Sequence, residues 1–463
     1  MIALACALVS ACLFFLALGT ADAWPLAWIA PVPVLWLAFG DAPWRRVGLA
    51  AALAYAAGQL GMLWPYLGAM GASALLIALG PAAVFAVVVL ATRNAARRLP
   101  AAASVVVFPA LWTGWEWSST TLSPHGTFGA WAYSQISAPL LIQGASVLGL
   151  WIVSFLVALV PSGIASTLRR RTLAPLAIAL VPALTNVAFG AVRLRAPQGT
   201  TTRVAASARD HDDRATPEST ALAQAAEAHR LASRGARVIV FDEKAALLPA
   251  ERRDAVLAPL VDASRATHAT LVAGYDQTGP ERRNAAYTIG PDGRVRTYTK
   301  RHHIPGLEQG YSTGDRPGLL DQGAAVAICK DMDFQRTLRG DAAAAGGGAL
   351  GLMLVPAWDF GADGWLHARM AIMRGVEGGY AIVRAASNGE LTVSDARGRV
   401  RATGVSGEGA YASIVADVPV GPGRTPYLRI GDAFGWLAGA AGLLALAWSA
   451  SRRRPPVRAV GTR

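Results

Sequence analysis

Residues 173–192 read LAPLAIALVPALTNVAFGAV, and residues 203–207, a short distance further on, read RVAAS. The first segment is long enough to cross a bilayer, because roughly 20 apolar residues span its hydrocarbon core. The second is typical of a short strand at the start of a soluble region. The sequence therefore predicts a change at this point from a membrane-spanning part to an α/β part.

Composition also indicates a protein that lies partly in lipid. The chain has 463 residues, of which 53% are hydrophobic and 16% are charged, and its mean hydropathy is +0.35. A soluble globular protein of this length is expected to have a smaller hydrophobic fraction and a larger charged fraction. The formal net charge of +13 comes largely from arginine clusters beside the apolar runs, which argues against nucleic acid as a partner.

Eight segments are apolar enough to be interpreted as membrane spans. Seven precede the soluble region and one follows it, at about 2–20, 24–40, 47–68, 72–92, 101–119, 141–166, 173–192 and 434–450. The first run lacks a basic n-region and continues directly into further apolar sequence. We therefore interpret it as a retained span and not as a secretory signal.

The distribution of arginine predicts the orientation of these spans. Four clusters fall on one side under the eight-span count, at 45–46, 93–98, 169–171 and 452–454. The loops on the other side, near Asp22, Ala69 and His125, are nearly free of Lys and Arg. The arginine-rich side is expected to be cytoplasmic. We thus expect seven helices in 1–195, an extracytoplasmic domain in 196–427, and the last helix with a basic cytoplasmic tail in 428–463.

The soluble region alternates strand-like and helix-like stretches, which favours an α/β layer architecture. Two stretches, 285–289 and 294–300, flank Gly290-Pro291-Asp292-Gly293 and predict a β-hairpin. The other predicted strands are 203–207, 238–241, 271–275, 324–329, 351–355, 380–385, 391–394 and 410–416. Helices are predicted over 217–234 and 365–378.

Three residues of complementary chemistry close predicted strands: Glu243, Lys300 and Cys329. The carboxyl ends of strands in an open α/β sheet converge on a site, so these side chains are expected to meet. A carboxylate can take the proton of a thiol, an ammonium can stabilise an oxyanion, and the thiol can carry an acyl group. The alternative is a buried structural cysteine with two unrelated surface charges.

Longer motifs surround these residues. Residues 298–305 read YTKRHHIP and are followed by Glu308, residues 326–329 read VAIC, and 368–389 and 425–427 carry further matching positions. In the apolar half, the matching segments are 112–117, 129–135 and 149–155. Together they resemble the nitrilase-type carbon–nitrogen hydrolase superfamily and, within it, the membrane-bound apolipoprotein N-acyltransferases.

The resemblance covers nearly the whole chain. It implies an α/β fold, an αββα nitrilase-type sandwich on an eight-helix transmembrane bundle. It also implies a catalytic triad of Glu243, Lys300 and Cys329, supported by Glu308 and Asp331.

Two departures from the family pattern matter for the site. The acid lies in Phe-Asp-Glu and not in Trp-Pro-Glu, which leaves Asp242 as a rival base. The nucleophile is followed by Lys330 and Asp331 where the family has an aromatic residue and Glu. Asp331 could keep the acidic role with a shorter reach, whereas Lys330 either lowers the pKa of the thiol or points to solvent.

The activity implied by the resemblance is ping-pong acyl transfer from a phospholipid, through a thioester, to the α-amino group of a diacylglyceryl-cysteine at a lipoprotein N-terminus. The implied location is the bacterial inner membrane, with a multi-pass monomer. Two alternatives stay open. A membrane-tethered nitrilase-type amidase would resolve the thioester with water, and a pseudoenzyme would serve as a scaffold only.

Adjacent histidines at 302 and 303 are the only hint of a metal site. Neighbouring residues on a strand or turn point in opposite directions, and no Cys or carboxylate at ligand spacing accompanies them. We expect neither a metal nor a cofactor.

Overall fold

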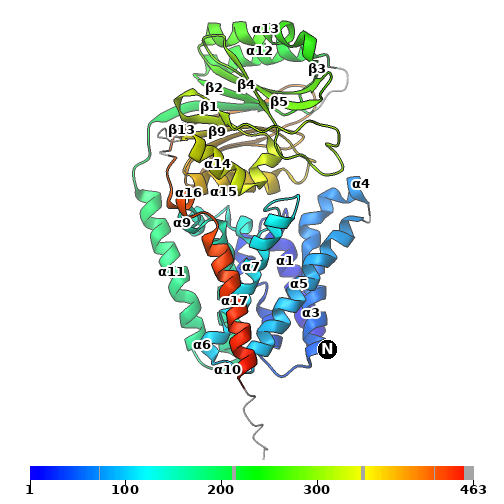
Figure 1. Cartoon of the computed structure of the whole chain (residues 1–463), viewed down its shortest axis with the longest axis vertical. Helices are drawn as coiled ribbons and strands as arrows, with labels where there is room; N and C mark the ends of the chain where they lie inside the picture. Colours follow the sequence, from blue (N-terminus) through cyan, green and yellow to red (C-terminus); the bar gives the residue numbers. More distant parts are fainter. Residues whose placement is uncertain (72, 211–214, 346–349, 422, 453–463) are drawn as a thin grey trace, which may run out of the picture.

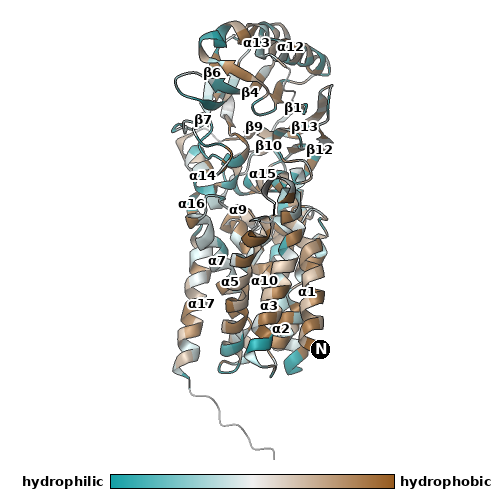
Figure 2. Cartoon of the chain, turned by 90° about the vertical axis from the view of Figure 1, so that its right-hand side faces the viewer, coloured by the Kyte–Doolittle hydropathy of each residue, from teal (hydrophilic) through white to brown (hydrophobic). Residues whose placement is uncertain are grey.

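The computed structural model describes residues 1–71, 73–210, 215–345, 350–421 and 423–452. A helical half and a layered α/β half are stacked along the long axis of the molecule (Figure 1). The helices of the first half are predominantly hydrophobic along their length, whereas hydrophilic residues are frequent in the second (Figure 2). The change of fold near residue 193 is thus present, because α11 ends at Arg195 and the first strand begins at Thr201.

Five helices of the described chain are long and apolar enough to cross a membrane. They are α3 with the short 3-10 helix η2 (Trp44–Tyr66), α5 (Ser73–Ala96), α10 (Leu150–Arg170), α11 (Ala174–Arg195) and α17 (Ala433–Ser451). Shorter helical segments connect them: α4 (Leu67–Met70), η3 (Trp131–Gln135), α8 (Pro139–Ile142), α9 (Ala145–Leu148) and α16 (Pro426–Ile430).

The other three predicted spans are shorter or broken, so helix length identifies five spans and not eight. The span predicted at 2–20 is α1 (Ile2–Leu18). The span at 24–40 divides into η1 (Trp24–Trp28) and α2 (Val32–Ala38), a region with three prolines, which cannot donate helical hydrogen bonds.

The span predicted at 101–119 divides into α6 (Ala101–Ser104) and α7 (Val107–Leu122). Pro109 explains this break, because it has no N–H for the carbonyl of Val105 four residues earlier. That carbonyl instead accepts a hydrogen bond of 2.7 Å from the hydroxyl of Ser162.

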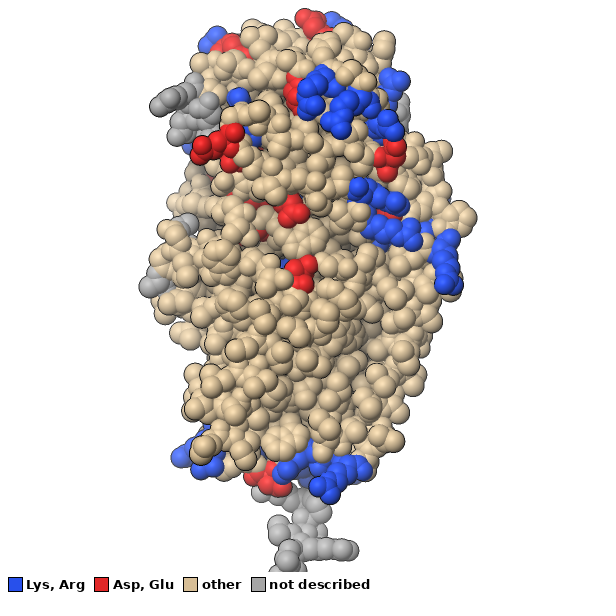
Figure 3. All heavy atoms as spheres, turned by 180° about the vertical axis from the view of Figure 1, so that it is seen from behind, with Lys and Arg blue, Asp and Glu red and all other residues tan. Residues whose placement is uncertain are grey.

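The arginine clusters gather at the end of the helical half that is remote from the α/β half. Hydrogen bonds across this end join Arg93 to the carbonyl of Ala42, Arg170 to that of Ala96, and Arg98 to that of Ser449. On the face shown in Figure 3, a broad band without charged side chains among the described residues separates this end from the α/β half. Arg453 and Arg454 lie outside the described residues.

Two sheets form the centre of the α/β half. The first runs in the order β13 (Ala412–Pro419), β1 (Thr201–Ala208), β2 (Val238–Phe241), β4 (Thr270–Thr278), β5 (Arg283–Ile289) and β6 (Val295–Thr299), and β3 (Leu247–Pro249) pairs with β4. The second runs in the order β12 (Val400–Val405), β11 (Glu390–Ser394), β10 (Ala381–Ser387), β9 (Leu352–Trp358), β8 (Ala324–Val326) and β7 (Gly318–Leu319).

These sheets pack face to face across an aliphatic core and are covered by helices on both outer faces. Helices α12 (Pro217–Ser233) and α13 (Arg253–Thr267) cover the first sheet. Helices α14 (Gln335–Ala344) and α15 (Gly364–Gly378) cover the second (Figure 1). Because α15 also shares a core with the helical half, it joins the two halves of the chain.

Most of the predicted strands are present, and the predicted hairpin is confirmed. Its strands β5 and β6 pair antiparallel, with Ala285 opposite Thr299, and Gly293 takes the positive φ of +80° that the turn requires. Among the described α-helices and strands between residues 196 and 419, five were not predicted: β3, α13, β7, α14 and β12. The strand predicted at 324–329 ends early, at Val326.

Candidate active site

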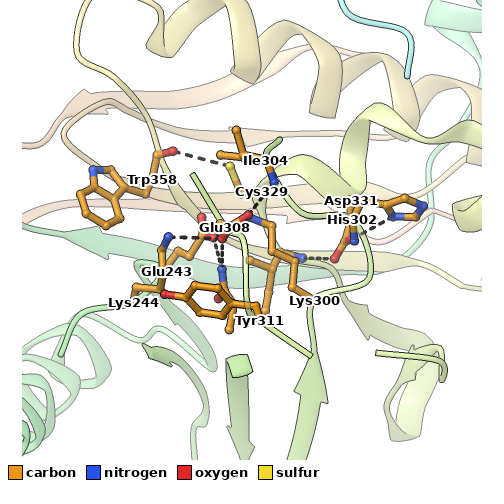
Figure 4. A network of polar contacts seen from close by, with 12 residues as sticks. Glu243, Lys244, Lys300, His302, Ile304, Glu308, Tyr311, Cys329, Asp331 and Trp358 are labelled. Carbon is orange, nitrogen blue, oxygen red and sulfur yellow. Dashed lines mark hydrogen bonds and ion pairs between the residues drawn. The ribbon is translucent and has the colours of Figure 1, made fainter. Parts of the chain in front are cut away.

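A buried cluster of acids and an amine lies where β2 and β6 end. The Lys300 ammonium is fully buried, and its Nζ lies 2.8 Å from Glu243 Oε1 and 2.8 Å from Glu308 Oε2. Glu308 comes from the loop after β6 and also accepts a hydrogen bond of 2.8 Å from the backbone N–H of Ile304 (Figure 4). Three of the five predicted site residues therefore meet directly.

Two further residues belong to this cluster and were not predicted. Asn284 on β5 donates through Nδ2 to Glu243 Oε1 at 2.5 Å and to Glu308 Oε1 at 2.8 Å. Lys244 Nζ lies 3.2 Å from Glu308 Oε1. In the sequence, Asn284 is marked only as a polar residue that directly precedes the apolar run of a predicted hairpin strand. In the structure its side chain is fully buried.

The cluster favours the charged forms of Lys300 and Glu308. Burial alone would lower the pKa of Lys300, but Glu243 and the other neighbouring negative charges raise it above its usual value. Burial would raise the pKa of Glu308, whereas Lys300 and Lys244 lower it. Both groups are therefore ionised near neutral pH.

Cys329 lies at a sharp turn between strand and helix. After β8 the chain passes through Ile328 into the 3-10 helix η6 (Cys329–Asp333), and Cys329 takes a φ of +41°. This left-handed conformation ends the strand earlier than predicted, since residues other than glycine seldom adopt it within a strand. The turn directs Sγ toward the carbonyl of Trp358, which lies 3.6 Å away (Figure 4).

The end of β9 contacts both the backbone of Glu243 and the thiol of Cys329. The backbone N–H of Glu243 donates to the carbonyl of Ala357 at 3.2 Å, and the next carbonyl along β9, that of Trp358, is the partner of Cys329. Burial raises the pKa of the Cys329 thiol above its usual value, the negative charge of Glu243 adds to this, and Lys300 opposes it. The thiol is therefore protonated at rest and needs a base to become a nucleophile.

Asp331 lies outside the cluster of Glu243, Lys300 and Glu308 and binds backbone groups instead. Its carboxylate accepts hydrogen bonds from the backbone N–H groups of Ile328, Arg301 and His302, at 3.0, 3.1 and 2.9 Å. It also accepts one of 2.7 Å from the hydroxyl of Tyr298. Burial would raise the pKa of Asp331, but hydrogen bonding to His302 lowers it. Asp331 thus fastens the turn at Cys329 to the segment after Lys300, and its hydrogen-bond partners among the described residues do not include Lys300.

Asp242 and Glu243 directly follow β2 and have different surroundings. Glu243 contacts Lys300, as described above. Burial raises the pKa of Asp242 to about 7; the charge of Arg209 opposes this rise, and the charges of Glu243 and Asp210 add to it. The Oδ1 of Asp242 has no hydrogen-bond partner among the described residues.

Lys330 is buried and does not point to solvent. Its Nζ lies 3.2 Å from Asp333 Oδ2 and 5.9 Å from the centroid of the Phe334 ring. The histidines that follow Lys300 diverge: His302 lies 3.0 Å from Asp331 through Nδ1, whereas the ring of His303 faces that of Tyr311.

A cavity of about 720 Å³ connects Cys329 with the helical half. Its wall near the nucleophile includes Cys329, Lys330 and Trp358. Its opposite wall comes from the helical half and is largely apolar, with Tyr55, Met62, Leu63, Ile77, Trp112 and Trp115 among the lining residues. A substrate group that reaches the thiol through this cavity therefore passes along side chains of α3, α5 and α7.

Residues 10–163 match the family model described as the apolipoprotein N-acyltransferase N-terminal domain. A relative named apolipoprotein N-acyltransferase, from Geobacter metallireducens, is 27% identical over 92% of this chain and 91% of its own length. Another of the same name, from Gloeobacter violaceus, is 30% identical over 47% of this chain and 46% of its own length. Among solved structures, an amidase of the nitrilase superfamily from Nesterenkonia is 22% identical, covers 50% of this chain and 95% of that chain, and has a TM-score of 0.43.

Proposed function

We propose that this chain is an apolipoprotein N-acyltransferase, as the family model matched by residues 10–163 and the relative that is 27% identical over 92% of the chain support, and that its site performs N-acylation of a lipoprotein. A fatty acyl chain moves from a phospholipid to Cys329 as a thioester. The acyl group then passes to the α-amino group of the acceptor's N-terminal diacylglyceryl-cysteine. Glu243, Lys300 and Cys329 carry the reaction on an αββα nitrilase-type domain.

In the first half-reaction, Glu243 takes the proton of the Cys329 thiol while sulfur attacks the ester carbonyl of the donor. The Lys300 ammonium stabilises the negative charge that develops on the carbonyl oxygen. When the tetrahedral intermediate collapses, the C–O bond breaks and Glu243 returns the proton to the departing lysophospholipid. In the second half-reaction, the amine attacks the thioester carbonyl and Glu243 takes a proton from the amine; the C–S bond then breaks and Glu243 gives this proton to the departing sulfur, which restores the thiol.

The cavity is the observation that carries this proposal. It leads from the thiol to apolar side chains of the membrane helices, so an acyl chain can reach sulfur without leaving an apolar environment. Moving an acyl chain from lipid into water costs about 0.8 kcal/mol per CH₂. Both the donor and the diacylated acceptor are held in a bilayer by such chains, which a site open to water alone would not accommodate.

The membrane arrangement follows from the same proposal. The arginine clusters at the far end of the helical half support a cytoplasmic location for that end, with domain 196–427 on the extracytoplasmic face of the inner membrane. This requires α1, η1 with α2, and α6 with α7 to act as crossings besides the five long helices, giving eight. The parts are then 1–195, 196–427 and 428–463, in a chain that acts as a monomer.

Product analysis in proteoliposomes tests the proposed activity. The full chain is reconstituted with a phospholipid whose acyl chains carry an isotope label, and a diacylated lipopeptide with a free α-amino group is added. Labelled N-acyl lipopeptide is expected, and an acceptor with an acetylated amine is expected to remain unmodified. Labelled free fatty acid without acylated peptide would indicate the amidase-type hydrolase and contradict the proposal, as would a wild-type chain that forms neither product.

A further inference from the structure

Almost all the cationic residues of this chain are arginines, and lysine is rare. Lysine and arginine together number 43, and only three of these are lysine: Lys244, Lys300 and Lys330. All three lie around the candidate nucleophile, since Lys330 follows it directly and the other two contact Glu308. A compact ammonium with three donors differs from a planar guanidinium in the partners it can hold, so Lys244 is chemically set apart from the arginines used elsewhere.

The backbone at Lys244 directs its side chain back into the cluster. Lys244 follows Glu243 directly and takes a φ of +51°, a left-handed conformation that lysine seldom adopts. Its Nζ lies 3.2 Å from Glu308 Oε1 and 4.9 Å from the centroid of the Trp358 ring. The carbonyl of Trp358 accepts the hydrogen bond of the Cys329 thiol. The Lys244 ammonium therefore contacts both Glu308 and the residue that holds the thiol.

The balance of charge among Glu243, Glu308 and Lys300 shows what the Lys244 ammonium contributes. Lys300 alone would leave the two buried carboxylates, Glu243 and Glu308, with one uncompensated negative charge. Two carboxylates in that situation share a proton, which raises the pKa of one of them. A proton held in this way would reduce the fraction of Glu243 that is free to accept the thiol proton.

The groups that face this region from other elements do not supply the missing charge. They are the ion pairs Arg282–Asp276 and Arg384–Asp359, the hydroxyl of Tyr311, and the imidazole of His303. Each ion pair is internally balanced, and burial lowers the pKa of His303 and so favours its neutral form. Within the described part of the chain, the balance of Glu308 therefore depends on Lys244.

We propose that Lys244 is a positioning residue that neutralises Glu308 and thereby reserves Glu243 to accept the proton of Cys329. This inference rests on the roles proposed above for Glu243, Lys300 and Cys329. Lys244 touches neither substrate nor sulfur in this account. It acts through Glu308 and through the Trp358 segment.

The test compares Lys244→Met, which removes the charge but keeps the length, with Lys244→Arg, which keeps the charge. The full chain in detergent is treated with iodoacetamide at a series of pH values, and alkylation at Cys329 is followed by peptide mass spectrometry, which separates it from Cys6 and Cys12. The same variants are assayed for the pH dependence of acyl transfer. Lys244→Gln is the second uncharged variant should Lys244→Met fail to fold.

Loss of the positive charge is expected to move both pH profiles upward by about one unit, which is roughly a tenfold lower rate on the rising limb. Lys244→Arg is expected to keep the wild-type profile even if the larger side chain lowers the rate. An uncharged variant whose profiles coincide with those of the wild type would overturn the inference. If the wild type transfers no acyl group, the proposed function fails, while the alkylation profiles still decide the role of Lys244.

Discussion

The hydroxyl of Thr127 donates to the backbone carbonyl of Asp333 at 2.9 Å. Thr127 lies in the loop after α7 and Asp333 ends η6, which begins with Cys329, so this bond joins the helical half to the turn that carries the thiol. The backbone N–H of Thr127 donates to the same carbonyl at 3.0 Å. Gly126 also packs closely here, because an added Cβ would lie 2.5 Å from the same oxygen.

Thr127→Val is expected to reduce kcat about three- to tenfold with little change in KM. Valine keeps the shape of the side chain and removes the hydrogen bonds of the hydroxyl to the carbonyl of Asp333 and to the hydroxyl of Tyr133, each worth about 1 kcal/mol, while the backbone bond remains. Initial rates of acyl transfer measure the effect. Thr121→Val is the matched control, because its hydroxyl bonds only within α7 and is exposed; equal losses in both variants would contradict a specific coupling.

Asn284→Leu is expected to lower the rate of acyl-enzyme formation by about 100-fold while the chain remains folded. The amide makes one hydrogen bond to each carboxylate of the cluster, and hydrogen bonds to charged groups contribute about 1.5–3 kcal/mol each. Single-turnover kinetics give the rate, and thermal unfolding in detergent reports the fold. A variant with wild-type rate would show that the orientation of Glu243 does not depend on Asn284.

Asp331→Asn is expected to lower stability by roughly 3 kcal/mol near neutral pH, since the buried carboxylate holds three backbone N–H groups. The pKa of Asp331 is lowered in the folded protein. Its contribution is therefore fully present above its unfolded pKa of about 3.9 and is lost as the pH falls through the lower folded value.

Thermal unfolding between about pH 7 and pH 3 measures this contribution. The difference in stability between the wild type and Asp331→Asn should be largest at neutral pH and should shrink in acid. A difference that is constant over this range would assign the effect to packing and not to the carboxylate charge.

The two adjacent acids give a direct comparison for the base. Glu243→Gln is expected to abolish acyl-enzyme formation, because the protonated thiol would have no acceptor for its proton. Asp242→Asn is expected to retain most of the rate, since its carboxyl group faces the surroundings of Arg209. The opposite result, with loss only in Asp242→Asn, would reassign the base.

Parts of the fold that follow from local pattern could be predicted from the sequence. The hairpin of β5 and β6 was predicted because a four-residue turn with two glycines separates two strand-like stretches. The break between α6 and α7 was not, because hydropathy does not report that Pro109 leaves the carbonyl of Val105 without its helical partner. Element β12 was missed because its residues alternate between exposed and half-buried and carry little hydrophobic signal.

For the site, strand ends and motif resemblance led to Glu243, Lys300 and Glu308, which lie in direct contact, and to Cys329, whose pKa the charges of Glu243 and Lys300 affect. The same reasoning could not separate Asp331 from these, because its orientation depends on three backbone N–H groups that converge only in the folded chain. Asn284 and Lys244 were missed for a similar reason. Their contacts depend on the approach of β5 and of the Glu308 loop, which are separated from β2 in the sequence.

The most direct test of the account is whether Cys329 carries the acyl group. The purified chain is incubated with phospholipid in the absence of acceptor, digested, and examined by peptide mass spectrometry beside Cys329→Ala. The account predicts a hydroxylamine-labile fatty acyl adduct on the peptide that contains Cys329, which disappears when the amine acceptor is added. N-acylated product formed without any such adduct, or by Cys329→Ala at the wild-type rate, would contradict it.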